Sequence, residues 1–314
     1  MKNYRVLLFL SLMIVAQPLI VRAQTPTVDQ LKMAFYSYDK SLALNPDLKD
    51  MPDKSEKLTE LRTRWRLTYD SAHDQTVTSI FALPKKAVFP CPAVVLLEGS
   101  GGHKDSDYVK IAADMFATMG YATLAIDTQY HGERAKKERS GDVHFIQSDT
   151  NRDGWVQTVI DLRRAVDYLQ SRKEVDGKRI GYIGFSQGGM IGGTFLGVEP
   201  RIIAGCLAVP GGGLVEWGKK AGIFKSDSME KVELNAEIVD PIYFIGRFSP
   251  RPLLILSAKR DELIPKYASE AIFNAAKEPK EIRWFESGHV LPPTAMVIDI
   301  KRFFKKWLEA PAKP

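Results

Sequence analysis

From residue 92 onward the sequence alternates short apolar runs with longer amphipathic segments, and this alternation strongly constrains the fold. Strand–helix–strand units around a mostly parallel sheet produce such a pattern. Six strands are predicted in this region, at 93–97, 122–126, 179–185, 202–209, 252–257 and 281–285. Helices are predicted at 108–119, 155–170, 188–196, 266–276 and 294–308. The pattern therefore predicts an α/β domain with a mostly parallel central sheet flanked by helices.

The chain before residue 92 is expected to add two strands and an N-terminal extension. Strands are predicted at 64–69 and 76–83, joined by a turn at 71–74. Residues 24–62 are polar and helix-prone, and they contain too few apolar side chains for a core of their own. We therefore expect residues 24–62 to form a helical wrap and residues 63–314 to form the α/β domain.

Two long connections interrupt the alternation, at residues 130–152 and 211–250. The second lies between the sixth and seventh predicted strands and contains the aromatic side chains of Trp217, Phe224, Tyr243 and Phe244. Long connections in compact α/β domains are often binding loops or lids. Residues 211–250 are therefore predicted to be a lid-like insertion beside the functional site.

Residues 1–23 have the composition of a secretory signal peptide. Two basic residues precede an apolar stretch at 6–16, and residues 21–23 offer small side chains for cleavage. Gln17 and Pro18 interrupt the apolar run, which is shorter than the roughly 20 residues that span a bilayer. We expect an exported protein, periplasmic or extracellular, with no membrane span in the mature form.

The charge balance argues against a nucleic-acid partner. The chain has 44 Lys and Arg against 38 Asp and Glu, a formal net charge of +6, and loss of the three basic residues before position 24 lowers this to +3. Proteins that bind nucleic acid or anionic membranes carry denser basic patches. Cys91 and Cys206 lie in or beside apolar runs, so we expect two separate buried thiols and no metal site.

The motif Gly-Phe-Ser-Gln-Gly at residues 184–188 joins a predicted strand to a helical pattern. Such a turn lifts the serine hydroxyl above the sheet edge, and the flanking glycines remove side chains that would clash. Phosphate-binding loops also join a strand to a helix, but neither GxGxxG nor GxxxxGK[ST] occurs in this chain. The motif therefore favours Ser186 as a nucleophile.

A serine nucleophile needs a histidine to take its proton and an acid to orient that histidine. In folds with this turn the order along the chain is serine, acid, histidine. Only His289 of the five histidines follows Ser186. Asp261 comes directly after a predicted strand, with Glu262 as its main competitor, whereas the two other aspartates before His289 fall inside the insertion. We predict a triad of Ser186, Asp261 and His289.

Acyl transfer also requires backbone N–H groups that face the developing oxyanion. One donor is expected from Gln187, which follows the nucleophile. The second is expected from the loop Glu-Gly-Ser-Gly-Gly at 98–102, with Ser100 favoured and Gly101 as the alternative. The alternative is that these glycines form a tight turn with no catalytic role.

At these residues the chain resembles the α/β-hydrolase superfamily, in particular the branch of dienelactone hydrolases and acetyl-xylan or related carbohydrate esterases. The resemblance runs from about residue 64 to residue 308 and includes His131-Gly132 after Asp127. Many relatives carry histidine where this chain has Glu98. The resemblance implies an α/β-hydrolase fold, a site that needs no cofactor or metal, and a loop-shaping rather than catalytic role for Asp127 and His131.

Together these features predict a serine hydrolase that cleaves a carboxylic ester through an acyl-enzyme on Ser186. Predicted export and the aromatic insertion favour a small-molecule or carbohydrate ester, such as an acetylated glycan. Serine peptidases, amidases and thioesterases share the acyl-enzyme step, so these alternatives stay open. A non-catalytic binding protein on the same fold is a further alternative. The sequence does not predict the oligomeric state.

Overall fold

The computed structural model describes residues 26–53, 55–137, 146–224 and 229–309. The predicted signal peptide at 1–23 lies outside the described residues. A nine-stranded sheet has the order β1-β2-β3-β5-β4-β6-β7-β8-β9. Its strands are β1 (Asp47–Asp50), β2 (Arg62–Ser71), β3 (Gln75–Pro84), β4 (Cys91–Leu97), β5 (Ala122–Ile126), β6 (Val175–Phe185), β7 (Ile202–Ala208), β8 (Leu253–Ala258) and β9 (Lys280–Phe285).

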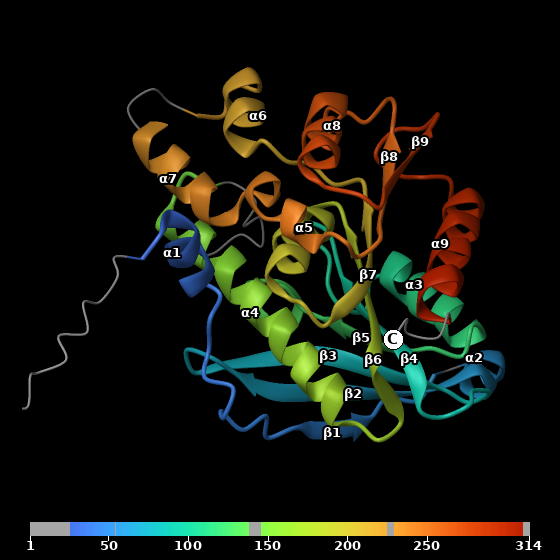
Figure 1. Ribbon diagram of the computed structural model, residues 1–314. Helices are drawn as coiled ribbons and strands as arrows, with labels where there is room; N and C mark the ends of the chain where they lie inside the picture. Colours follow the sequence, from blue (N-terminus) through green and yellow to red (C-terminus); the bar gives the residue numbers. More distant parts are fainter. Residues whose placement is uncertain (1–25, 54, 138–145, 225–228, 310–314) are drawn as a thin grey trace, which may run out of the picture.

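The sheet is mostly parallel, as predicted. The five pairings that join β5, β4, β6, β7, β8 and β9 are parallel, whereas β1, β2 and β3 form an antiparallel end. The insertion at 211–250 lies between β7 and β8, which are the sixth and seventh of the eight strands that the sequence predicted. Figure 1 shows the twisted sheet with helices on both sides.

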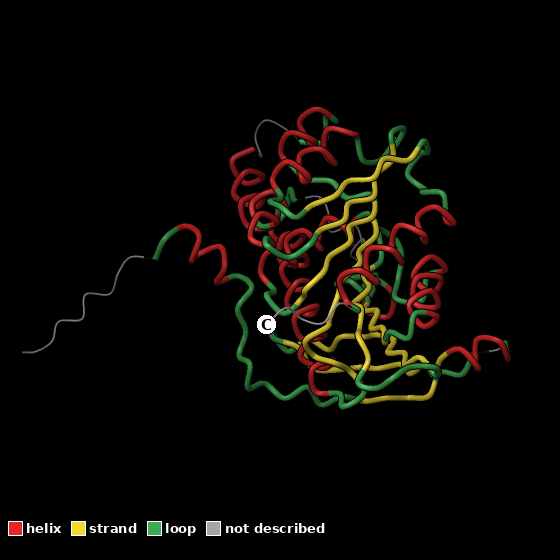
Figure 2. Tube along the Cα trace, turned by 45° about the vertical axis from the view of Figure 1, so that its right-hand side comes forward, coloured by secondary structure: helices red, strands yellow, loops and turns green. Residues whose placement is uncertain are grey.

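Each face of the sheet has its own helical layer. The helices are α1 (Val28–Ala34), α2 (Glu56–Leu61), α3 (Asp107–Thr118), α4 (Asp149–Ser171), α5 (Gln187–Val198), α6 (Leu214–Lys220), α7 (Met229–Val239), α8 (Lys266–Ala275) and α9 (Pro293–Leu308). Short 3₁₀ turns are η1 (Gly132–Arg134), η3 (Pro241–Tyr243) and η4 (Ile245–Phe248). Helices α3 and α9 cover one face and α4 and α5 the other, so the sheet is the middle of three layers (Figures 1 and 2).

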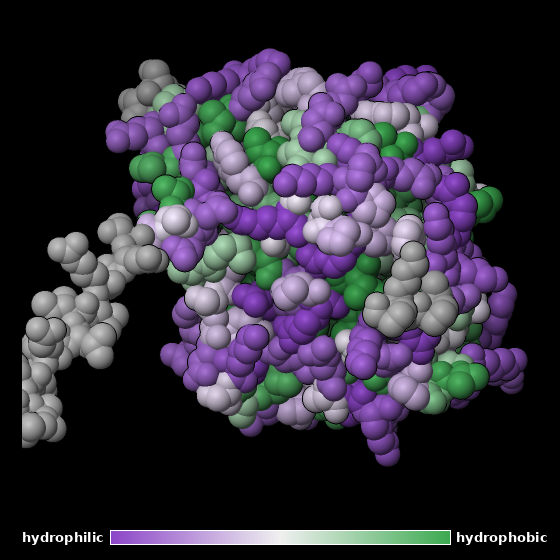
Figure 3. Space-filling model, viewed as in Figure 1, coloured by the Kyte–Doolittle hydropathy of each residue, from purple (hydrophilic) through white to green (hydrophobic). Residues whose placement is uncertain are grey.

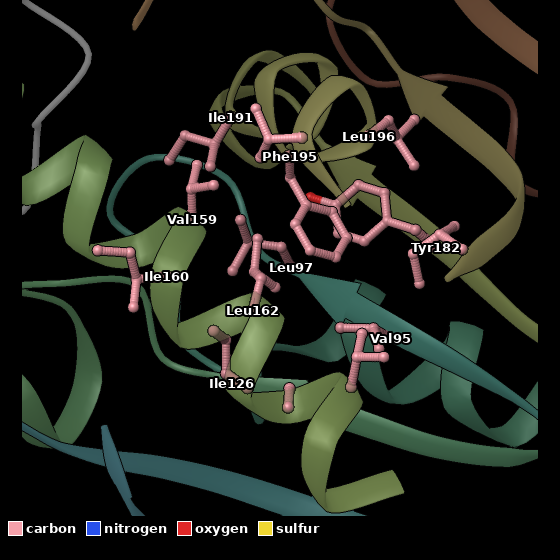
Figure 4. Packing of buried hydrophobic residues seen from close by; sticks show 14 of the residues in the cluster. Val95, Leu97, Ile126, Val159, Ile160, Leu162, Tyr182, Ile191, Phe195 and Leu196 are labelled. Atoms are coloured by element: carbon pink, nitrogen blue, oxygen red, sulfur yellow. The ribbon is translucent and has the colours of Figure 1, made fainter. Parts of the chain in front are cut away.

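Side chains of the central strands alternate between the two layers because successive residues of a strand point to opposite faces. Val95 and Leu97 of β4 belong to the cluster beneath α4 and α5, whereas Val94 and Leu96 belong to the cluster beneath α3 and α9. Figure 4 shows Phe195 and neighbouring α5 side chains packed toward this first cluster. Burial on both faces explains why the parallel strands read as nearly continuous apolar runs.

The N-terminal segment differs from the predicted helical wrap, because its middle forms the edge strand β1. This strand reads Asp-Leu-Lys-Asp and pairs antiparallel with β2, with three of its four side chains exposed. Its polar sequence carries no apolar alternation, and backbone pairing alone defines it. The segment is anchored to α4, where Arg164 donates to the carbonyl oxygens of Leu42 and Ala43.

The second half of the insertion belongs to the core. Phe244 and Phe248 are buried, at 0% and 1% exposure, whereas Tyr243 is 43% exposed. Only some of the aromatic side chains in the predicted lid are therefore exposed.

Polar side chains cover most of the face seen in Figure 3, with apolar ones in small groups. Among the described residues, no helix has the length and apolar character needed to cross a membrane.

Candidate active site

Ser186 occupies a strained turn between β6 and α5. Its backbone has φ 51° and ψ −114°, a region that non-glycine residues rarely adopt and that clusters at functional sites. The turn is tightly enclosed: a Cβ atom at Gly184 would lie 2.1 Å from the carbonyl oxygen of Gly188. The small residues of the motif therefore permit the sharp turn that the sequence predicted.

His289 hydrogen-bonds both other members of the predicted triad. Its Nε2 lies 3.0 Å from Ser186 Oγ, and its Nδ1 lies 2.8 Å and 3.0 Å from the two carboxylate oxygens of Asp261. An ionised carboxylate only accepts hydrogen bonds, so Nδ1 carries the proton and Nε2 is left to accept from the serine hydroxyl. Ser186, Asp261 and His289 follow β6, β8 and β9, whose C-terminal ends share one edge of the sheet.

The Asp261 carboxylate is held in its ionised form. Burial alone would raise its pKa, but the hydrogen bonds from His289 and from the backbone N–H groups of Ile264 and Leu263 outweigh burial and lower the pKa. A negative charge at this position orients the imidazole and stabilises its protonated form.

The other acidic candidates that the structure describes do not hydrogen-bond His289. Glu262 is exposed, and none of its interactions in the described part of the chain is a hydrogen bond to His289. Asp240 is buried and accepts from the backbone N–H groups of Gly213, Leu214 and Ile242, so it fixes the insertion. Asp227 lies outside the described residues.

The two predicted oxyanion donors lie side by side. Gln187 is the first residue of α5, where backbone N–H groups lack an intrahelical partner, and its side-chain Oε1 accepts from Ser100 Oγ at 2.7 Å. The loop is close to the nucleophile, because a Cβ atom at Gly99 would lie 3.1 Å from Ser186 Cβ. The Gly99 N–H donates to Tyr108 Oη at 2.9 Å, so this N–H group is already engaged.

A cleft of about 310 Å³ begins at His103, directly after this loop in the chain. It is lined by Met51, Arg66, Ile80, His103, Lys104, Asp105, Gly132 and Glu133. Its charges are paired, since Arg66 donates to Glu133 at 2.9 Å and the Lys104 ammonium lies 2.7 Å from the same carboxylate. Sequence reasoning missed this cleft because its residues come from two strands and three separate connections with no shared motif.

Comparison with known proteins identifies the family. Residues 37–211, more than half of the chain, match the family model described as acetyl xylan esterase (AXE1). The chain belongs to the AXE1 acetyl xylan esterase family. This AXE1 member is also similar to "Putative hydrolase YtaP" of Bacillus subtilis (strain 168), with 32% identity over 174 residues that cover 49% of this chain and 58% of the relative. The chain spans about half the length of the curated relatives it matches.

Solved structures share the fold of this AXE1 member. The acetyl xylan esterase from Paenibacillus sp. R4 superposes with a TM-score of 0.72 and 22% identity, covering 90% of this chain and 93% of the other. The alpha/beta hydrolase GrgF from Penicillium sp. sh18 superposes with a TM-score of 0.60 and 16% identity, covering 79% and 99%. The predicted α/β-hydrolase fold is thereby confirmed.

In this AXE1 member the loop after β5 is built around a buried carboxylate. Asp127 accepts from Thr78 Oγ1 at 2.6 Å and from the backbone N–H of Lys104 at 2.9 Å, and its side chain also pairs with the Lys104 ammonium. Gly132 is required beside it, since a Cβ atom there would lie 2.3 Å from an Asp127 oxygen. The Lys104 contact could not be predicted, because no sequence periodicity links the two loops.

Neither cysteine is part of the triad. Both cysteines are described, and both are free and buried, with burial raising the pKa of each thiol. Within the described ranges, no group of three His, Cys, Asp or Glu side chains could hold a metal ion.

Proposed function

We propose that the protein is a serine hydrolase that cleaves a carboxylic ester through an acyl-enzyme on Ser186. The observation that supports this most directly is the continuous hydrogen-bonded line from Ser186 Oγ through the His289 imidazole to Asp261. As Oγ attacks the ester carbonyl carbon, Nε2 of His289 takes the hydroxyl proton and Asp261 stabilises the imidazolium. The imidazolium then gives the proton to the leaving alcohol. A water molecule, deprotonated by the same imidazole, releases the acid and restores Ser186.

The tetrahedral intermediate carries its negative charge on the former carbonyl oxygen. We assign its stabilisation to the backbone N–H groups of Gln187 and Ser100, which belong to adjacent turns beside the nucleophile. The N-terminal end of α5 adds a favourable dipole at this position.

The substrate class that we propose is an acyl ester, foremost acetyl, borne on a carbohydrate. Membership of the AXE1 family supports this class. In this proposal an extended substrate also reaches the cleft that begins at His103. Its lining carries both cationic side chains, Arg66 and Lys104, and anionic ones, Asp105 and Glu133, and so suits a neutral polyhydroxylated molecule better than an ion. Amide and thioester substrates would use the same acyl-enzyme step.

Substrate panels test this proposal. Wild-type protein should hydrolyse p-nitrophenyl acetate and acetylated xylo-oligosaccharides faster than matched anilides and thioesters, and Ser186→Ala should abolish turnover of all of them. Ser37→Ala, at an exposed serine near α1, should behave as wild type. Full ester turnover by a folded Ser186→Ala variant would refute the proposal, and preferential cleavage of anilides would favour the amidase alternative.

We further propose that the protein is exported to the periplasm or the extracellular space. The support is the composition of residues 1–23, with its basic start and apolar stretch. N-terminal sequencing of the protein from periplasm or culture medium should begin at Gln24. An intact Met1 on cytoplasmic protein would contradict export.

A further inference from the structure

Glu98, the first residue of the proposed oxyanion loop, is a fully buried acid with 0% exposure. Its Oε1 accepts the backbone N–H of Thr128 at 2.7 Å and lies 3.1 Å from Nδ1 of His131. Its Oε2 is buried with no hydrogen-bonding partner among the described residues. In the same part of the chain no lysine or arginine forms an ion pair with it.

Such an arrangement costs stability. A buried carboxylate loses its hydration, and an oxygen without a partner recovers none of that loss. Buried polar groups that stay unsatisfied call for a specific explanation, and functional geometry is one of them. The position of Glu98 supplies that explanation.

The main chain of Glu98 packs against the turn that carries the nucleophile. A Cβ atom at Gly188 would lie 2.5 Å from the carbonyl oxygens of both Glu98 and Leu97, so the start of α5 rests directly on this backbone. The next residue, Gly99, approaches Ser186. Any shift of Glu98 therefore moves the loop relative to the nucleophile.

The side chain of Glu98 connects this loop to a third segment. Thr128 and His131 belong to the connection after β5, and β5 is the neighbour of β4 in the sheet. On its other side the loop is held by Tyr108, which accepts from Gly99 N–H, and by the Ser100–Gln187 hydrogen bond. The Glu98 carboxylate is thus the β5-side anchor next to Gly99, whereas Asp127 holds the connection farther along, at Lys104.

We propose that Glu98 is a positioning residue for the oxyanion hole. By accepting from Thr128 N–H and from His131 Nδ1–H, its carboxylate fixes the Gly99–Ser100 backbone at the distance from Ser186 that donation to an oxyanion requires. This inference rests on the proposed acyl-enzyme function of the site. In this proposal Glu98 does not contact the substrate.

The test compares two substitutions that differ in accepting ability. Glu98→Gln keeps an acceptor oxygen for both donors and should retain kcat within about threefold. Glu98→Met has similar length without an acceptor, and it should lower kcat on p-nitrophenyl acetate by on the order of 10- to 100-fold, less than the roughly 10²- to 10³-fold cost of deleting an oxyanion donor. KM should stay nearly unchanged, because oxyanion contacts form mainly in the transition state.

A second buried acid provides the matched control. Glu199 is also 0% exposed, but it pairs with Arg201 and Arg163 at the end of α5 remote from Ser186. Glu199→Met should lower the temperature of unfolding while the folded protein keeps its kcat.

Two results would overturn the inference without touching the proposed function, which Ser186→Ala tests separately. The first is a folded Glu98→Met protein with wild-type kcat, and the second is a rise in KM at constant kcat. Should Glu98→Met not fold, His131→Leu takes its place. It removes one of the two donors and should lower kcat severalfold at constant KM, so an unchanged kcat there would equally overturn the inference.

Discussion

The imidazole Nε2 of His289 lies 3.0 Å from Oγ of Ser186, although the two residues are 103 positions apart in the chain. The parallel sheet creates this proximity, because the strands that precede the two residues end at the same edge. Each side chain leaves its strand in a short turn, so neither depends on a long loop for its position. The nucleophile and its base are therefore preorganised by the fold itself.

Replacement of the acid should disable the base without disturbing the fold. Asp261→Asn presents an amide to His289 in place of a carboxylate, so the imidazole loses the charge that fixes its tautomer. We expect kcat on p-nitrophenyl acetate to fall by roughly 10³- to 10⁴-fold.

Glu262→Gln is the matched control for this substitution, since the neighbouring exposed acid does not hydrogen-bond His289 among the described contacts. Its kcat should remain near that of wild type. A large loss in Glu262→Gln together with an active Asp261→Asn would mean that the acid is misassigned.

Glu133 should make the free energy of unfolding depend on pH in the acid range. The hydrogen bond from Arg66 and the nearby Lys104 lower the pKa of Glu133 to about 2, against an ordinary value of 4.5. Since the folded-state pKa is depressed, the stabilisation is fully present above about pH 4.5 and is lost as the pH falls toward 2. Urea unfolding should therefore show a smaller decline of the free energy of unfolding across this range in Glu133→Gln than in wild type. Identical pH profiles would contradict this assignment.

The cleft that begins at His103 should matter only for extended substrates. Arg66→Ala removes a cleft-lining guanidinium, and loss of one hydrogen bond to a sugar hydroxyl costs about 1 kcal/mol. We expect KM for acetylated xylo-oligosaccharides to rise by about fivefold, while KM for p-nitrophenyl acetate stays unchanged. Equal effects on both substrates would indicate that Arg66 acts through the structure of the site and would argue against a carbohydrate cleft.

Much of the fold was predictable because its determinants are local. Buried parallel strands produce apolar runs that periodicity detects, and the chain order of serine, acid and histidine then points to Ser186, Asp261 and His289. The structure places His289 within hydrogen-bonding distance of both Ser186 and Asp261. The polar strand β1 escaped prediction because backbone pairing at a sheet edge leaves no apolar pattern.

Contacts between loops could not be read from the sequence. Glu98 and His131 form a buried pair across two connections, and Asp127 binds Lys104 in the same way. Neither pairing follows from spacing or propensity, because both depend on which strands become neighbours in the sheet. The burial of Phe244 was missed for a similar reason, since aromatic content alone does not show which side of an insertion faces the core.

Covalent labelling of Ser186 by a fluorophosphonate tests the central claim most directly, because this reagent reacts with serine hydroxyls that a neighbouring base has activated. Mass spectrometry of the digested folded protein should find one adduct, on the peptide containing Ser186, and none after denaturation or in His289→Ala. Failure of the folded wild-type protein to react, or an adduct at another serine with Ser186 unmodified, would contradict the account.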